Sequence, residues 1–240
     1  MYGKGVFGAD GDVALNTALM APFAADRGLL RQRINAALQA ASARCEVDAT
    51  RTAGVGYCFG GMCVLELARM GAPVQGVASV HGIFSPGNAP NASITAKVLC
   101  LHGHDDPMVP PEQVLAFEQE MSAAGVDWQM HVYGGTTHAF TNPGANNPDF
   151  GTVYSTTANA RASRSIETFL GELFRAEQNE MITPTGEKIS TIENYTNFSV
   201  LTGDTINGRD GTKEVSINVL ADYKQYNSET SEVVALYNFL

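Results

Sequence analysis

One hexapeptide in this sequence has the residue types and spacing of a nucleophile elbow. Gly56-Tyr57-Cys58-Phe59-Gly60-Gly61 follows the short apolar run 52–57 and precedes a helical pattern at 61–69. Its glycines let the chain turn sharply, so that the Cys58 side chain projects from the end of a strand. The Phe59 amide and the start of the following helix then offer positive potential to a thiolate and to an oxyanion. The six residues also fit a small buried cysteine beside helix-packing glycines, so the motif alone does not decide.

A nucleophilic cysteine needs a general base, and the base needs an acid that orients it. Asp106 comes just after a predicted strand at 97–101, and His138 just after a predicted strand at 128–133. The order nucleophile, acid, histidine, each beyond the carboxyl end of a strand, is typical of active sites on parallel sheets. The pattern therefore predicts a triad of Cys58, Asp106 and His138.

Each triad member has a second interpretation. Asp106 followed by Pro107 could simply begin a turn, and the neighbouring Asp105 could be the acid instead. His138 could be a hydrogen-bonded loop histidine without chemistry. A redox-sensing thiol at Cys58 would need a resolving partner, and the nearest cysteine, Cys63, falls on the helix and is expected to face the core.

The other histidines carry weaker signals. His131 lies inside a predicted strand and is given a structural role, whereas His81 ends the strand at 76–80 and is a minor candidate for lining the pocket. The run His102-Gly103-His104-Asp105-Asp106 is similar to a zinc cluster of the H-x-H-x-D type, but Pro107 stands where that pattern wants a further histidine. A zinc hydrolase would also not need the cysteine elbow, so we predict no metal site.

Strands and helices alternate along the first three quarters of the chain. Strands are predicted at 52–57, 76–80, 97–101 and 128–133, and helices at 61–69, 111–124, 158–174 and within 13–43, where two amphipathic stretches break near Pro22 and Asp26. Such alternation predicts an α/β fold with a mostly parallel sheet flanked by helices.

Composition limits the partners. A net charge of −10 and a pI near 4.9 disfavour nucleic acid and anionic membranes, which bind basic surfaces. With 44% hydrophobic residues the chain is expected to be globular, and no run approaches the length of a membrane span. The four cysteines, at 45, 58, 63 and 100, are too sparse for a disulfide scaffold, so reduced thiols and a cytoplasmic location are expected.

The composition changes near Met181. Residues 1–180 contain two lysines, and residues 181–240 contain three lysines, two alanines and no cysteine, histidine or tryptophan. The tail is β-rich at 195–201, 213–223 and 231–240, with Asn-Gly and Asp-Gly turns between, so a small antiparallel sheet is predicted. We therefore expect two parts, an α/β domain at 1–178 and a tail of unknown role at 181–240.

Together the elbow, the segment Met1-Tyr2-Gly3-Lys4-Gly5, the 102–110 stretch and the 134–140 stretch resemble the dienelactone hydrolase (carboxymethylenebutenolidase) family over about residues 2–176. The resemblance implies an α/β-hydrolase fold without a cofactor and a Cys58–His138–Asp106 triad. It further implies that this triad cleaves small lactones or activated esters through a thioester, with the Phe59 amide binding the oxyanion.

Three departures from the family pattern shape the expectations. The chain starts at the end of a family strand, so the first strands are expected to be absent, together with a loop that supplies a second oxyanion amide and a glutamate. Loss of one donor costs about 10²–10³ in rate, which makes an impaired enzyme or a non-catalytic interaction module the alternative.

The exposed strand edge left behind favours self-association, unless the tail covers that edge. The substrate-binding positions implied by the resemblance are Tyr2, Lys4 and Asn142; the last two stand where the family has arginines that hold a substrate carboxylate, which disfavours dienelactone itself. The tail matches no part of the family.

Overall fold

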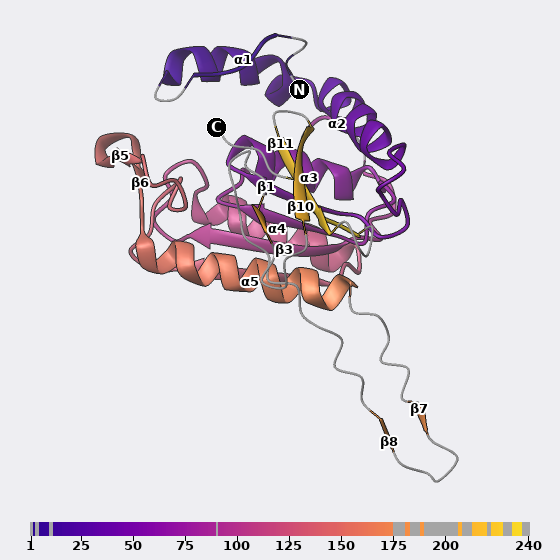
Figure 1. Ribbon diagram of the computed structural model, residues 1–240. Helices are drawn as coiled ribbons and strands as arrows, with labels where there is room; N and C mark the ends of the chain where they lie inside the picture. Colours follow the sequence, from indigo (N-terminus) through magenta and orange to yellow (C-terminus); the bar gives the residue numbers. More distant parts are fainter. Residues whose placement is uncertain are drawn as a thin grey trace.

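The computed structural model describes residue 2 and residues 5–9, 12–89 and 91–174, together with the backbone of short strands within 181–236. Helices and strands alternate as predicted (Figure 1). In chain order they are α1 (Val13–Ala25), α2 (Arg27–Ser42), β1 (Ala53–Tyr57), α3 (Phe59–Arg69), β2 (Gly76–Val80), β3 (Lys97–Gly103), α4 (Pro111–Ala123), β4 (Trp128–Tyr133), β5 (Asn146–Asn147), the 3₁₀ turn η1 (Pro148–Phe150), β6 (Thr152–Val153) and α5 (Thr156–Phe174).

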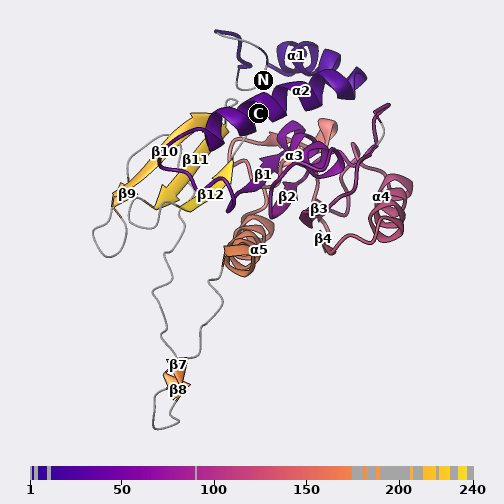
Figure 2. The ribbon, with the colours of Figure 1, turned by 90° about the vertical axis from the view of Figure 1, so that its right-hand side faces the viewer.

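Strands β1 to β4 form one parallel sheet in the order β1-β2-β3-β4. Helices α3 and α4 cover one face and α5 covers the other, while α1 and α2 lie outside α3 (Figure 2). All four carboxyl ends therefore meet at one edge of the sheet, where the loops after β1, β2, β3 and β4 converge. The α/β fold with a flanked parallel sheet is confirmed.

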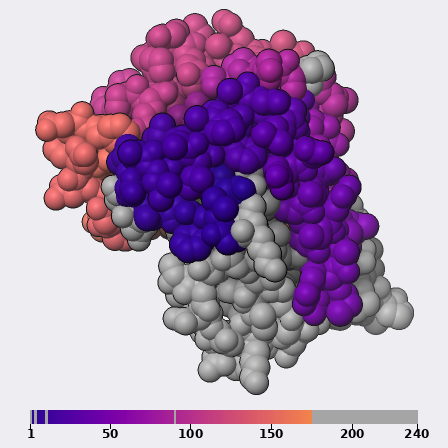
Figure 3. All heavy atoms as spheres, turned by 90° about the horizontal axis from the view of Figure 1, so that it is seen from above, coloured from indigo at the N-terminus to yellow at the C-terminus, as the bar shows by residue number. Residues whose placement is uncertain are grey.

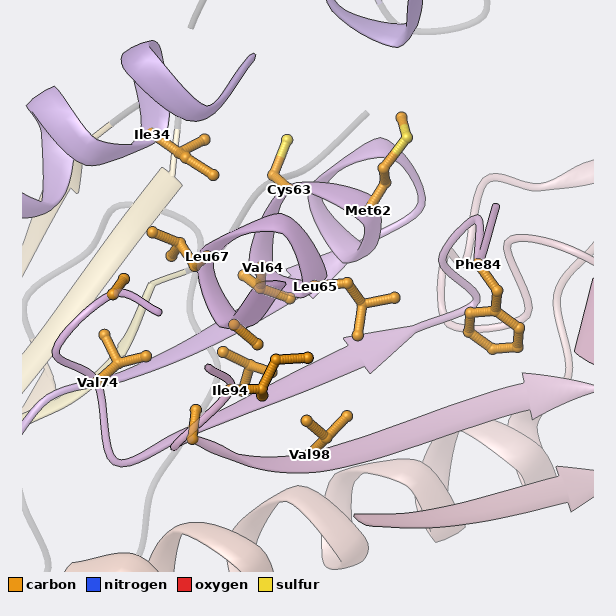
Figure 4. Packing of buried hydrophobic residues seen from close by; sticks show 14 of the residues in the cluster. Ile34, Met62, Cys63, Val64, Leu65, Leu67, Val74, Phe84, Ile94 and Val98 are labelled. Carbon is orange, nitrogen blue, oxygen red and sulfur yellow. The ribbon is translucent and has the colours of Figure 1, made fainter. Parts of the chain in front are cut away.

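The core has a layer on each face of the sheet. One layer packs α2 and α3 on the sheet, and Figure 4 shows Cys63 and Ile34 on opposite sides of the gap between these two helices. The other layer packs α5 on the sheet through Ile166, Phe169 and Leu170. Both faces of β1, β2 and β3 are buried, as crossover connections require, whereas β4 at the edge of the sheet is only partly buried.

Helix α3 is further held by buried charges. Arg69 pairs with Glu66 on its own helix at 3.0 Å and with Glu120 of α4 at 2.7 Å, and Arg31 of α2 reaches Glu66 at 2.8 Å. Removing one partner from such a network leaves a buried charge unpaired, so the network fixes how α3 lies against its neighbours.

The N-terminal helices differ from expectation in one detail. Pro22 lies inside α1, and the break between the helices falls at Asp26 alone, whose carboxylate accepts the Leu29 amide and caps α2.

Seen from above, α1 and α2 cross the molecule while the segment carrying β5 and β6 projects at one side (Figure 3). None of the helices in the described ranges is both long and apolar enough to cross a bilayer.

Within the tail, the described strands are antiparallel, as predicted. They are β7 (Met181–Ile182), β8 (Lys188–Ile189), β9 (Ile206–Asn207), β10 (Lys213–Val219), β11 (Asp222–Asn227) and β12 (Glu232–Leu236). The segment predicted to be β-rich at 213–223 contains β10 and the start of β11, which pair from Val219 with Asp222 onward. The β-rich segment predicted at 195–201 lies outside the described residues. Strand β12 lies beside β1 (Figure 2) but belongs to a separate sheet.

Candidate active site

The chain makes a strained turn at Cys58, between β1 and α3. Cys58 has φ 53° and ψ −117°, a region that residues with a Cβ avoid. The turn brings β1 and α3 so close that a Cβ on Gly56 would lie 2.0 Å from the Gly60 carbonyl oxygen. A Cβ on Gly61 would lie 2.6 Å from the Gly82 Cα. The predicted elbow is therefore present, and the close approach of backbone atoms requires glycine at positions 56 and 61.

The three predicted triad residues meet beyond the carboxyl ends of β1, β3 and β4. His138 Nε2 lies 2.9 Å from Cys58 Sγ, and His138 Nδ1 lies 2.7 Å from Asp106 Oδ2. His138 is 1% exposed and Asp106 3%, whereas Cys58 is half-buried. Asp106 Oδ1 accepts the Met108 amide at 2.9 Å, which holds the carboxylate in place. The alternative acid, Asp105, is exposed.

The surroundings of His138 favour its charged form. Burial by itself lowers the pKa of His138, but hydrogen bonds to Asp106 and Cys58 and the charges of both groups raise it to about 10. At neutral pH the imidazolium therefore donates one N–H to Asp106 and the other toward the sulfur. Such a pair can deliver a nucleophile and a proton donor from adjacent atoms.

The hairpin of β5 and β6 holds the loop that carries His138. The His138 amide donates to the Gly151 carbonyl at 2.9 Å, and the Val153 amide donates to the His138 carbonyl at 3.2 Å. Both partners belong to the segment around β5 and β6, which pairs as a hairpin. The hairpin thus fixes the backbone on both sides of the His138 ring.

The residues predicted to bind substrate are only partly near the triad. Tyr2 stacks on the Phe59 ring, with centroids 6.3 Å apart, directly beside the elbow. The Phe59 amide is the first of α3 and has no partner within the helix, which suits an oxyanion donor. Asn142 is exposed and its Oδ1 accepts the Gly144 amide of its own loop. Lys4 lies outside the described residues.

Sequence reasoning underrated His81. The Cys58 amide lies 3.2 Å from His81 Nδ1, and His81 Nε2 lies 2.8 Å from Thr141 Oγ1. Its ring is 5.1 Å from that of His138. The signal that could have found it was its place at the carboxyl end of β2, between the strands that carry Cys58 and Asp106.

The remaining histidines are not members of the triad. His131 contacts Ser165 of α5 and lines a cavity of about 450 Å³ between β4 and α5, whose lining contains no triad residue. His102 is buried beside Phe84 and His104 is exposed, so the H-x-H-x-D run does not converge. Within the described ranges, no three His, Cys, Asp or Glu side chains form a group that could hold a metal.

The redox interpretation lacks an exposed partner thiol nearby. Cys63 is buried in the layer that joins α2 and α3 (Figure 4), and Cys100 is buried in β3. Burial raises the pKa of the Cys100 thiol far above its ordinary value. Cys45 is exposed but precedes β1, at the opposite end from the elbow.

Comparison with known proteins gives one consistent result. Residues 1–174 match the model of the dienelactone hydrolase family. The crystal structure of a dienelactone hydrolase-like promiscuous phosphotriesterase, P91, from metagenomic libraries is 39% identical with a TM-score of 0.65, over 68% of this chain and 70% of that one. A structure described as m3DLH is 35% identical, also with a TM-score of 0.65, over 70% of each chain.

A shorter protein is also similar to this chain. The uncharacterized protein K02A2.1 of Caenorhabditis elegans is 32% identical over 151 residues, which is 61% of this chain and 96% of that protein. The family match over residues 1–174 includes the α/β part that carries the elbow.

Proposed function

The chain belongs to the dienelactone hydrolase family and is a hydrolase by that membership, and we propose that it cleaves small lactones or activated carboxylic esters with Cys58 as nucleophile. One observation carries the proposal: Cys58 Sγ, His138 and Asp106 form a continuous hydrogen-bonded series with contacts of 2.9 and 2.7 Å. That series has the geometry of a nucleophile, its base and an orienting acid.

Acylation starts from a thiolate beside the His138 imidazolium. The sulfur attacks the carbonyl carbon, and the Phe59 amide stabilises the oxyanion that forms. When the intermediate collapses, the ester C–O bond breaks and His138 gives its Nε2 proton to the leaving oxygen. The product is a thioester on Cys58, with His138 now neutral.

Deacylation uses the same residues in reverse. Neutral His138, held by Asp106 with its proton on Nδ1, takes a proton from water through Nε2. The resulting hydroxide attacks the thioester carbon, the C–S bond breaks, and the carboxylic acid leaves. Cys58 and His138 return to the charged pair, so no cofactor enters the cycle.

A second substrate class follows from one relative. P91, which is 39% identical, is described as a promiscuous phosphotriesterase. Since a thiolate can attack phosphorus as well as carbon, phosphotriesters are proposed as secondary substrates of the same cysteine. Turnover of a nitrophenyl phosphotriester that disappears in Cys58→Ala would support this extension, and turnover that persists in the variant would refute it.

Mass spectrometry after brief exposure to p-nitrophenyl acetate tests the main proposal. An acetyl adduct on Cys58 is expected in the wild type and in the matched control Cys45→Ala, which removes an exposed cysteine outside the site. Cys58→Ala should release no burst of product, and His138→Ala should fail to turn over. No adduct, or one found equally on Cys45, would refute thiol catalysis.

A further inference from the structure

The ring of His81 makes a second connection between the Cys58 elbow and the loop that carries His138, beside the contact between Cys58 Sγ and His138 Nε2. His81 follows β2 and is buried, with 3% of its surface exposed. On one side its Nδ1 lies 3.2 Å from the Cys58 amide, and on the other its Nε2 lies 2.8 Å from Thr141 Oγ1, three residues after His138. The ring therefore spans from the elbow to the histidine loop.

The contacts define one tautomer. The Cys58 amide can only donate, so Nδ1 must present its lone pair, and Nε2 must carry the proton that it donates to Thr141 Oγ1. Burial, followed by the charge of nearby His138, lowers the pKa of His81 well below its ordinary value, which keeps the ring neutral. A neutral ring accepts the amide without opposing the proton on His138.

Backbone strain is found at the same residues. Within the described ranges, three non-glycine residues have positive φ: Cys58 at 53°, His81 at 38° and Ala139 at 54°. They come from three different strand ends, yet all three lie at or next to the cysteine, the bridging ring and His138. Strain of this kind persists where surrounding contacts hold it and gathers at functional sites.

An ordinary core role explains these contacts less well. The Cys58 amide already donates to the Val80 carbonyl at 3.0 Å, so it does not need His81 for satisfaction. An apolar side chain could fill the space between Phe140 and Tyr57, but it would make neither of the two directed hydrogen bonds. What the imidazole adds is a link of defined length between the backbone of the nucleophile and the loop of the base.

We propose that His81 is a positioning residue, which holds the Cys58 elbow and the His138 loop in register through its hydrogen bonds to the Cys58 amide and to Thr141. The inference rests on the proposed function, because register matters only if Cys58 reacts with the help of His138. Loss of the link should lengthen the 2.9 Å contact between Cys58 Sγ and His138 Nε2, although all three triad side chains are still present in the protein.

The test measures alkylation of Cys58 by iodoacetamide across the neutral pH range, followed by peptide mass spectrometry. His81→Phe keeps an aromatic ring at this position and removes both hydrogen bonds. The alkylation rate should fall about 10-fold to 100-fold, and its pH dependence should shift. Thr141→Val removes one hydrogen bond with little change of shape, and a loss of about 3-fold to 10-fold is expected. Thr141→Ser retains the hydroxyl, so Cys58 in this variant should be alkylated at a rate close to that of the wild type.

A double-mutant cycle separates a link from two independent effects. The double variant His81→Phe/Thr141→Val should be within about 2-fold of His81→Phe alone, since both changes break one connection. His131→Phe is the matched control. It makes the same substitution in β4, where the His131 ring contacts Ser165, and Cys58 in this variant should be alkylated at the wild-type rate.

The outcomes distinguish this inference from the proposed function. Fast wild-type alkylation of Cys58 together with unchanged rates in His81→Phe and Thr141→Val would overturn the positioning role and leave the thiol hydrolase standing. Losses in the two single variants that multiply in the double variant would also overturn it, because the residues would then act separately. Wild-type Cys58 that alkylates no faster than Cys45 would overturn both.

Discussion

Replacing Asp106 by asparagine should disable the site while leaving the fold intact. The Asp106 carboxylate accepts two hydrogen bonds, from the Met108 amide at 2.9 Å and from His138 Nδ1 at 2.7 Å. An asparagine side chain has one acceptor and one donor end. If its oxygen keeps the Met108 amide, its NH₂ faces Nδ1 and forces the proton of neutral His138 onto Nε2, where the base must be free.

The opposite orientation of asparagine is no better. Its oxygen would then face His138, but its NH₂ would meet the Met108 amide, placing two donors against each other in a buried position. Either way His138 loses the negative charge that helps to raise its pKa to about 10. In serine triads the corresponding change costs about 10⁴ in kcat, and we expect a fall of about 10³–10⁴ here, equivalent to about 4–5 kcal/mol in the activation barrier.

The assay is hydrolysis of p-nitrophenyl acetate, with circular dichroism to show that the variant is folded. Asp105→Asn is the matched control, because it makes the same change at the adjacent exposed carboxylate and should keep the wild-type rate. A folded Asp106→Asn protein within tenfold of wild type, or an Asp105→Asn protein that is the slower of the two, would show that the assignment of the acid is wrong.

Three further predictions concern the fold and its pH dependence. Gly56→Ala places a Cβ 2.0 Å from a backbone oxygen and should lower the free energy of unfolding by about 3 kcal/mol or more. Gly134→Ala is the control, because a Cβ there meets nothing within 4 Å, and its free energy of unfolding should stay within about 0.5 kcal/mol of the wild type. Urea unfolding measures both. Because the pKa of His138 is raised from 6.5 to about 10, its contribution to stability is complete below pH 6.5 and is lost as the pH rises toward 10, by up to about 5 kcal/mol. His138→Gln should flatten this dependence in urea unfolding, and an equal loss in the variant would contradict it. If β12 shields β1, hydrogen exchange should be slow in both strands of the full chain; free exchange throughout 213–236 would end that idea.

Much of the site was predictable because its signals are local. Gly56 is needed for a turn whose geometry involves only the elbow and its own helix, and the alternation of strands and helices follows from short-range patterns. Parallel connection then places every strand end at one edge, so Cys58, Asp106 and His138 could be grouped before any coordinates were known.

The sequence by itself determined the family, the α/β class and the elbow, since these depend on residue types at short spacing. Only the tertiary structure decided between Asp105 and Asp106: neighbouring residues in a turn point in different directions, and the Met108 amide selects which carboxylate faces His138. The role of His81 was equally out of reach, because its partners, the Cys58 amide and Thr141, are 23 and 60 residues away and meet it only when three loops pack together.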